Sequence, residues 1–161
     1  MESIYNKTMS ELEDYFLEKQ DKKFRAVQVF EWLYQKKVST FEEMSNLKKE
    51  VIATLEADFS ISSISIKKIE RDQDVSKYLF SLKDGEKIEA VLMNHHYGNS
   101  LCISTQVGCN MGCKFCESGR LKKVRNLETA EMVEQILKVE QEEHVRISHV
   151  VVMGIGEPFD N

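Results

Sequence analysis

The stretch "SLCISTQVGCNMGCKFCESG", residues 100–119, runs from a short strand pattern directly into a loop that is rich in cysteine. Three of its cysteines, Cys109, Cys113 and Cys116, follow a CxxxCxxC spacing, and Cys102 lies upstream in the strand pattern. The chain contains no other cysteine. Cysteines clustered in this way indicate metal binding or catalysis, because a disulfide framework scatters its cysteines along a secreted chain.

Two kinds of metal centre suit this loop. Three thiolates can hold three corners of a 4Fe-4S cluster and leave its fourth iron open to a ligand that the protein does not supply. Alternatively, Cys102, His95 or His96 can complete a four-ligand zinc site, since zinc tolerates varied ligand spacing. We prefer the cluster because the chain has no second paired CxxC and because Cys102 lies inside a predicted strand. Phe115, next to the last cysteine, is expected to shield one side of the cluster from water.

The segments around the loop predict an α/β fold. Residues 127–144 have the periodicity of an amphipathic helix with its glutamates outward, and residues 147–154 form a nearly continuous apolar strand. Strand, helix and strand make one βαβ unit, whose second strand is expected to be parallel and covered on both faces. Asp84-Gly85 predicts a hairpin turn. The remaining strand patterns occupy residues 63–70, 77–83 and 87–94.

The N-terminal part predicts helices. Apolar side chains recur there at helical spacing, and Thr8 with Glu11 predicts a capping box. The stripes are Met9, Leu12, Tyr15 and Phe16; Val27, Phe30, Leu33 and Tyr34; and Leu47, Val51, Ile52 and Leu55. We therefore expect a small helical accessory domain at 1–60, a β-strand and hairpin region at 61–98, and the opening of a larger α/β domain at 99–161, since one βαβ unit cannot close a sheet.

The composition is that of a globular chain, with 42% hydrophobic and 30% charged residues. No apolar run approaches the roughly 18 residues of a membrane span, and the N-terminus lacks the apolar core of a secretory signal, so a cytoplasmic protein without a membrane partner is expected. The net charge of -5 gives no sign of a nucleic-acid partner. A local excess of cations that can meet phosphates comprises Lys114, Arg120, Lys122, Lys123 and Arg125.

The CxxxCxxC loop, with an aromatic residue before its last cysteine, resembles the signature of radical S-adenosylmethionine enzymes. The motif "GIGEP" at residues 154–158 resembles that superfamily's GxGEP-type element. The resemblance extends to the RlmN/Cfr family of RNA adenine C-methyltransferases, through "CISTQVGCNMGCKFC", "RNL" and "VVMGIGEPFDN". In the N-terminal half it continues through "KFRAVQVFEWLYQKKVSTFEEMSNL" and "DGEKIEAVLMNHHYGNSLCIS", so it covers nearly the whole chain in order.

The resemblance implies a fold and a set of cofactor ligands. The fold would be the truncated start of a radical S-adenosylmethionine partial (βα)6 barrel, preceded by the helical accessory domain, which would help to engage RNA. Cys109, Cys113 and Cys116 would hold a 4Fe-4S cluster whose open iron binds S-adenosyl-L-methionine. Gly156 and Glu157 would contact that cofactor.

Two further residues acquire a chemical role only through the resemblance. Glu89 would accept a proton near the target adenine, and Cys102 would help to resolve a covalent adduct between enzyme and RNA. Strand alternation puts Cys102 on the face opposite Leu101 and Ile103, where it is better placed for chemistry than among aliphatic side chains. From the residues alone, a buried structural cysteine and a solvated strand carboxylate are the simpler interpretations.

The implied function is methylation of carbon 2 of an adenine in 23S rRNA, and in tRNA for RlmN members, through a methyl-cysteine intermediate. An electron donor such as flavodoxin is an implied partner. The family's methyl-carrying cysteine lies near its C-terminus, so we expect this chain to be a fragment that is inactive alone. Two alternatives stay open: a Cfr-type enzyme acting on carbon 8, whose members often read "GEA" where this chain reads "GEP", and a non-catalytic zinc-knuckle module that binds RNA.

Overall fold

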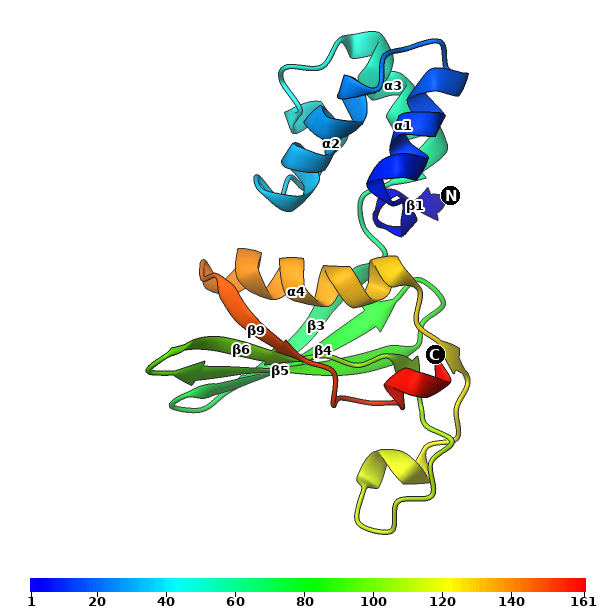
Figure 1. Ribbon diagram of the computed structural model, residues 1–161. Helices are drawn as coiled ribbons and strands as arrows, with labels where there is room; N and C mark the ends of the chain where they lie inside the picture. The colour runs from blue at the N-terminus through cyan, green and yellow to red at the C-terminus, as the bar shows by residue number, and fades with distance from the viewer. The chain divides into compact units, whose positions relative to one another are not determined.

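The computed structural model describes residues 1–161 and divides into two compact units, Met1–Ser62 and Ser63–Asn161 (Figure 1). The first unit is mostly helical, whereas the second combines a sheet with one long helix. The predicted α/β class with a helical N-terminal part is therefore confirmed. None of the helices is both long and apolar enough to cross a membrane.

The first unit contains three α-helices and a short parallel strand pair. These elements are α1 (Met9–Glu18), α2 (Phe24–Tyr34), α3 (Lys49–Asp58), β1 (Glu2–Ser3) and β2 (Phe59–Ser60), with 3-10 turns at Ile4–Asn6 and Phe41–Glu43. The predicted capping box begins α1: Thr8 N donates to Glu11 Oε2 at 2.7 Å, and Glu11 N donates to Thr8 Oγ1 at 3.3 Å. Two backbone donors that a helix start leaves open are satisfied in this way.

The apolar stripe predicted for α2 is displaced in the structure. Val27 is 44% exposed, and the buried face of the helix consists of Ala26, Val29 and Leu33. The sequence pattern favours the larger side chain, but the small Ala26 side chain is the one that fits fully into the core. The placement of Val27 in the core was wrong by one position.

One five-stranded sheet organises the second unit, in the order β3-β4-β5-β6-β9. Its strands are β3 (Ile64–Arg71), β4 (Val75–Leu82), β5 (Lys87–His95), β6 (Gly98–Cys102) and β9 (Ile147–Val151). All neighbours are antiparallel except β6 and β9, whose parallel pairing confirms the predicted βαβ unit. The hairpin turn between β4 and β5 is also confirmed, because Gly85 has a φ of 90° and donates its N–H to Leu82 O at 3.1 Å.

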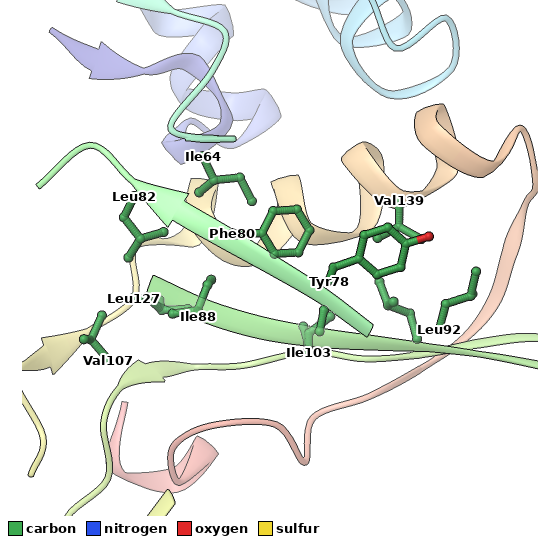
Figure 2. Close-up of a cluster of buried hydrophobic side chains, with 12 residues drawn as sticks. Ile64, Tyr78, Phe80, Leu82, Ile88, Leu92, Ile103, Val107, Leu127 and Val139 are labelled. Carbon is green, nitrogen blue, oxygen red and sulfur yellow. The ribbon is translucent and has the colours of Figure 1, made fainter. Parts of the chain in front are cut away.

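Helix α4 (Thr129–Glu143) covers one face of this sheet, and a cluster of buried side chains fills the layer between them (Figures 1 and 2). Alternate residues of each strand supply the cluster, as the pleat requires. The fully buried members include Tyr78, Phe80, Ile88 and Leu101. Full burial of a side chain of this size contributes about 1.5–3 kcal/mol, so the cluster holds α4 firmly on the sheet.

Two features of this layer differ from the sequence expectation. The glutamates of α4 were expected to face outward, but Glu131 and Glu134 are 5% and 1% exposed because each carboxylate has polar partners inside the fold. Strand β9 was expected to be covered on both faces and to reach residue 154. It ends at Val151 as an edge strand, and Val150 is 43% exposed.

Candidate active site around the cysteine loop

The cysteine loop leaves β7 (Gln106–Val107), passes through a 3-10 turn at Glu117–Arg120 and returns through β8 (Arg125–Asn126). β7 and β8 pair antiparallel, so the two ends of the loop lie side by side. Just beyond this strand pair, Cys109 N donates to Leu121 O at 3.0 Å. Gly108 has a φ of 73°, and a Cβ there would lie 2.1 Å from Lys122 O, so only glycine allows the two arms of the loop to approach this closely.

The structure places the three predicted cluster ligands in this one loop. Cys109 is buried, Cys113 is exposed and Cys116 is half-buried, and all are free thiols. Met111 N donates to Cys109 Sγ at 3.4 Å, and hydrogen bonds from the backbone of Gly119 and Ser118 lower the pKa of Cys116. Donors of this kind stabilise thiolates, which are the form that binds iron.

The thiols are nevertheless not gathered around a common point. No group of three or more His, Cys, Asp or Glu side chains in the chain lies close enough together to hold a metal ion, and this includes Cys102, His95 and His96. Three thiols in one loop are the ligands that a 4Fe-4S cluster with one open iron requires. The three sulfur atoms have to come closer together before a cluster can bind to all of them. Phe115 was expected to cover the cluster, but its side chain is 95% exposed.

Glu89 and Cys102 lie on the open face of the sheet, opposite α4. In the β5–β6 register Cys102 faces Val91, which lies two residues along β5 from Glu89, so both point to the same face. Leu101 and Ile103 point instead into the core, as strand alternation predicts. Glu89 pairs with Lys77 of β4 at 2.8 Å, and this hydrogen bond raises the pKa of Lys77.

A hollow of about 400 Å³ brings Glu89 together with the cysteine loop. The sheet contributes Lys77 and Glu89, the loop contributes Ser118, and Ile155 comes from the GIGEP segment. Its complete lining is Lys77, Leu79, Lys87, Glu89, Glu117, Ser118, Leu121 and Ile155. The predicted base, the cysteine loop and the GIGEP segment thus border one space, whereas Cys102 lies on the same sheet face outside this lining.

Gly156 and Glu157 form a turn packed against the start of β7. Gly156 has a φ of 111°, and Glu157 N donates to Gln106 Oε1 at 3.0 Å. The Glu157 carboxylate accepts from Phe159 N at 3.0 Å and caps the 3-10 turn Pro158–Asp160. Hydrogen bonds within the chain therefore fix the backbone of this turn.

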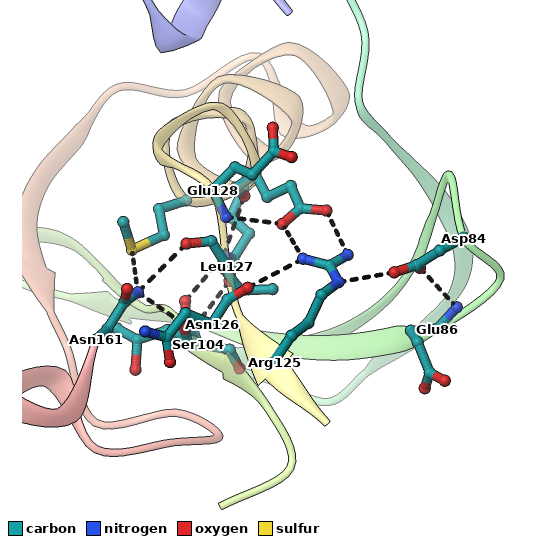
Figure 3. A network of polar contacts seen from close by, with 12 residues as sticks. Asp84, Glu86, Ser104, Arg125, Asn126, Leu127, Glu128 and Asn161 are labelled. Atoms are coloured by element: carbon teal, nitrogen blue, oxygen red, sulfur yellow. Dashed lines mark hydrogen bonds and ion pairs between the residues drawn. The ribbon is translucent and has the colours of Figure 1, made fainter. Parts of the chain in front are cut away.

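Most of the cations near the loop already have carboxylate partners. Arg125 bonds Asp84 of the β4–β5 turn and Glu131 of α4, and so ties the hairpin to the helix (Figure 3). The pKa of Asp84 is lowered by this guanidinium. Lys123 pairs with Asp160 at 2.8 Å. The local positive charge that the sequence suggests is thus largely neutralised.

Sequence reasoning missed the buried polar residues that support this site. Ser104 and Gln106 are both 0% exposed. Ser104 Oγ donates to Glu89 O at 2.6 Å and accepts from Ile155 N at 3.0 Å. The available signal was the run "STQ", three polar residues that continue an apolar strand and need partners when buried.

Comparisons with known proteins relate this chain to a family of RNA methyltransferases. Residues 3–61 match the family described as "Ribosomal RNA large subunit methyltransferase N-terminal domain". Over 169 residues, the chain is 53% identical to "Probable dual-specificity RNA methyltransferase RlmN" of Shouchella clausii, a match covering 99% of this chain and 47% of that protein. Its identity to the protein of that name from Lysinibacillus sphaericus is 54%, over 99% of this chain and 43% of the relative.

Over its length, the chain matches proteins of the RlmN family. A crystal structure of a radical SAM methyltransferase from Sphaerobacter thermophilus is 32% identical and superposes with a TM-score of 0.92, covering 100% of this chain and 49% of that one. The chain therefore spans about half the length of the RlmN proteins that it matches. Both the helical unit and the cysteine-loop unit fall within the RlmN alignments.

Proposed function

We propose that the whole protein is a radical S-adenosylmethionine enzyme that methylates carbon 2 of an adenine in 23S rRNA and in tRNA. One observation carries the proposal. Glu89, the cysteine loop and the GIGEP segment border a single hollow in a chain that is 53% identical to an RlmN protein. Its partners in this proposal are the two RNAs and an electron donor such as flavodoxin.

The cysteine loop would hold the cofactors. Cys109, Cys113 and Cys116 would bind the 4Fe-4S cluster, and Gly156 with Glu157 would contact the amino-acid part of S-adenosyl-L-methionine. When bound, the cluster and S-adenosylmethionine supply the one-electron chemistry that an electron-poor ring carbon requires. The backbone donors to Cys116 lower its pKa and so favour the thiolate form needed for iron binding.

Glu89 and Cys102 would act on the RNA base. The Lys77 ammonium holds the Glu89 carboxylate at the rim of the hollow, where it can accept a proton from an adenine inside. Cys102 lies on the neighbouring strand β6, diagonal to Glu89 on the same sheet face and roughly 7–8 Å from it, and its half-buried thiol can reach an adduct formed there. A Cfr-type reaction at carbon 8 is the alternative, and the proline of "GEP" favours carbon 2.

A metal-content experiment tests the cluster and separates it from a zinc knuckle. After anaerobic reconstitution with iron and sulfide, we expect visible absorption from a 4Fe-4S cluster, its loss in Cys113→Ala and its retention in Cys102→Ala. A zinc knuckle completed by Cys102 predicts a colourless protein in which both variants lose the metal. Absence of a cluster in the unsubstituted protein would sink the proposal.

An RNA experiment tests the reaction. Mass analysis of 23S rRNA and tRNA from cells with and without the gene should reveal a methyl group on carbon 2 of an adenine that depends on the gene. Methylation at carbon 8 would instead support the Cfr-type alternative, and unmodified RNA in both strains would count against both enzymes.

A further inference from the structure

Gln106, the first residue of β7, is fully buried where β7 meets the Gly156–Glu157 turn of the GIGEP segment and the return arm of the cysteine loop, residues 123–126. It is 0% exposed. Its Oε1 accepts from Glu157 N at 3.0 Å. Its Nε2 donates to Asn126 Oδ1 at 3.0 Å, to Asp160 O at 3.2 Å and to Asp160 Oδ2 at 3.1 Å. One amide therefore bonds the GIGEP turn on one side and the return arm of the cysteine loop on the other.

The turn at Gly156 is shaped against the same side chain. A Cβ at Gly156 would lie 2.7 Å from Gln106 Cβ, so the glycine lets the turn rest directly on the glutamine. The backbone N–H groups of Thr105 and Gln106 both donate to Ile155 O, at 2.9 and 3.2 Å. Main chain and side chain of β7 together define where Glu157 lies.

Asp160 extends this connection to the cysteine loop. Lys123, on the return arm of the loop, donates from Nζ to Asp160 Oδ2 at 2.8 Å and to Asp160 O at 3.1 Å. The carboxylate thus accepts from both Lys123 and Gln106, and these hydrogen bonds lower the pKa of Asp160. A buried amide that loses its partners is costly, so the three segments keep one mutual arrangement.

We propose that Gln106 is a positioning residue that fixes the Gly156–Glu157 turn relative to the cysteine loop. The inference rests on the proposed function, in which the loop holds the cluster and the turn contacts S-adenosyl-L-methionine. Gln106 touches neither cofactor in this scheme. It sets the spacing between the two surfaces that S-adenosyl-L-methionine must bridge, and therefore the affinity for that molecule.

Reversing the hydrogen-bond polarity provides the test. Gln106→Glu removes the amide donor and puts a second carboxylate against Asp160, whereas Gln106→Glu combined with Asp160→Asn restores one donor and one acceptor. Gln135→Glu is the matched control, because Gln135 is also 0% exposed and bonds the neighbouring Ser104 backbone through Oε1 and Nε2 but forms no hydrogen bond with the Gly156–Glu157 turn. If Gln106→Glu does not fold, Asp160→Ala removes an exposed carboxylate that accepts hydrogen bonds from Gln106 and Lys123.

Two readouts are measured on the full-length protein. Hydrogen–deuterium exchange of residues 154–161 without the cluster should be roughly tenfold faster in Gln106→Glu and Asp160→Ala, as expected for one lost hydrogen bond. Equilibrium dialysis of S-adenosyl-L-methionine with the reconstituted protein should show roughly tenfold weaker binding at unchanged iron content. The double variant should recover most of both losses, and Gln135→Glu should lower the melting temperature while leaving exchange in the turn and S-adenosyl-L-methionine affinity unchanged.

The outcomes keep this inference distinct from the proposed function. Unchanged exchange and affinity in Gln106→Glu, equal effects in Gln135→Glu, or no recovery in the double variant would each overturn the role of Gln106. If the unsubstituted protein binds no cluster and no S-adenosyl-L-methionine, the proposed function fails. The exchange measurement then still decides whether Gln106 orders the turn.

Discussion

At the scale of single residues, Glu89 shows how a functional carboxylate can resemble an ordinary surface residue. It is half-buried and pairs with Lys77 across two strands, and such exposed pairs contribute only about 0–1 kcal/mol to stability. Its position at the hollow beside the cysteine loop is what distinguishes it. The sequence alone could not show this, because the residues that border the hollow are far apart along the chain.

We therefore predict that Glu89→Gln separates activity from stability. The amide keeps the size of the side chain but cannot accept a proton, so methylation of RNA by the reconstituted enzyme should fall by about 100-fold or more. The melting temperature should stay nearly constant. Glu70→Gln is the control, since Glu70 pairs with Lys68 on the same sheet face, outside the lining of the 400 Å³ hollow. Full activity in Glu89→Gln would remove the residue from the proposed mechanism.

Residue-level reasoning from sequence succeeded where a periodic rule applies and failed where a partner was needed. Alternation correctly put Cys102 opposite Leu101 and Ile103, since the strand period is a local property. It could not identify Gln106, because the value of a buried amide depends on Glu157 and Asp160, more than fifty residues away along the chain. The cysteine spacing predicted a shared loop, but the positions of the sulfurs depend on how that loop closes.

At the scale of secondary structure, α4 (Thr129–Glu143) lies within the predicted helix of residues 127–144 and is amphipathic, but its buried face includes charges. Glu131 is held by Arg125, and Glu134 accepts from Ser63 N and Ile64 N at the start of β3. A hydrophobicity pattern assigns every glutamate to the solvent side. Burial of a carboxylate becomes acceptable once it accepts several hydrogen bonds, and here the donors to Glu134 come from residues 71 and 70 positions away.

Glu134 should make the stability of the second unit depend on pH. Burial raises the pKa of this carboxyl, and the opposing effects of the Ser63 and Ile64 amides and of Lys138 do not reverse the shift. The folded state then holds its proton more tightly than the unfolded state, so this group's contribution to stability falls as pH rises above the ordinary glutamate pKa of about 4.3. Glu134→Gln has no proton to lose. Relative to the unsubstituted chain it should therefore gain stability as the pH rises above about 4.

Urea unfolding at several pH values measures this difference directly. Glu142→Gln, an exposed position on the same helix, controls for the loss of one negative charge. A stability difference for Glu134→Gln that is independent of pH, or that shrinks as pH rises, would show that burial does not control this carboxyl.

At the scale of the whole molecule, the order of pattern types along the chain predicted the fold class. Helical stripes precede alternating strands in the sequence, and helices precede the five-stranded sheet in the structure. The exposure of β9 could not be foreseen, because an apolar strand pattern does not reveal whether another segment covers it. Val152 and Met153, just past its end, are 39% and 78% exposed.

The domain division itself stays a prediction, and the two cores allow it to be tested. Leu12 in α1 and Phe80 in β4 are both 0% exposed, each within its own unit. Truncation to alanine should cost about 2–5 kcal/mol in either place. If residues 1–62 fold independently, Leu12→Ala should lower the melting of the first unit by roughly 10 °C or more and leave the second unit unchanged.

The chain contains a single tryptophan, Trp32, which lies in α2 and therefore reports on the first unit alone. Its fluorescence transition should move in Leu12→Ala and stay in place in Phe80→Ala. Circular dichroism of the sheet should respond in the opposite way, because the five-stranded sheet lies entirely in the second unit. A Trp32 transition that shifts equally in both variants would mean that the two cores unfold as one cooperative body, and that the helical part is not a separate domain.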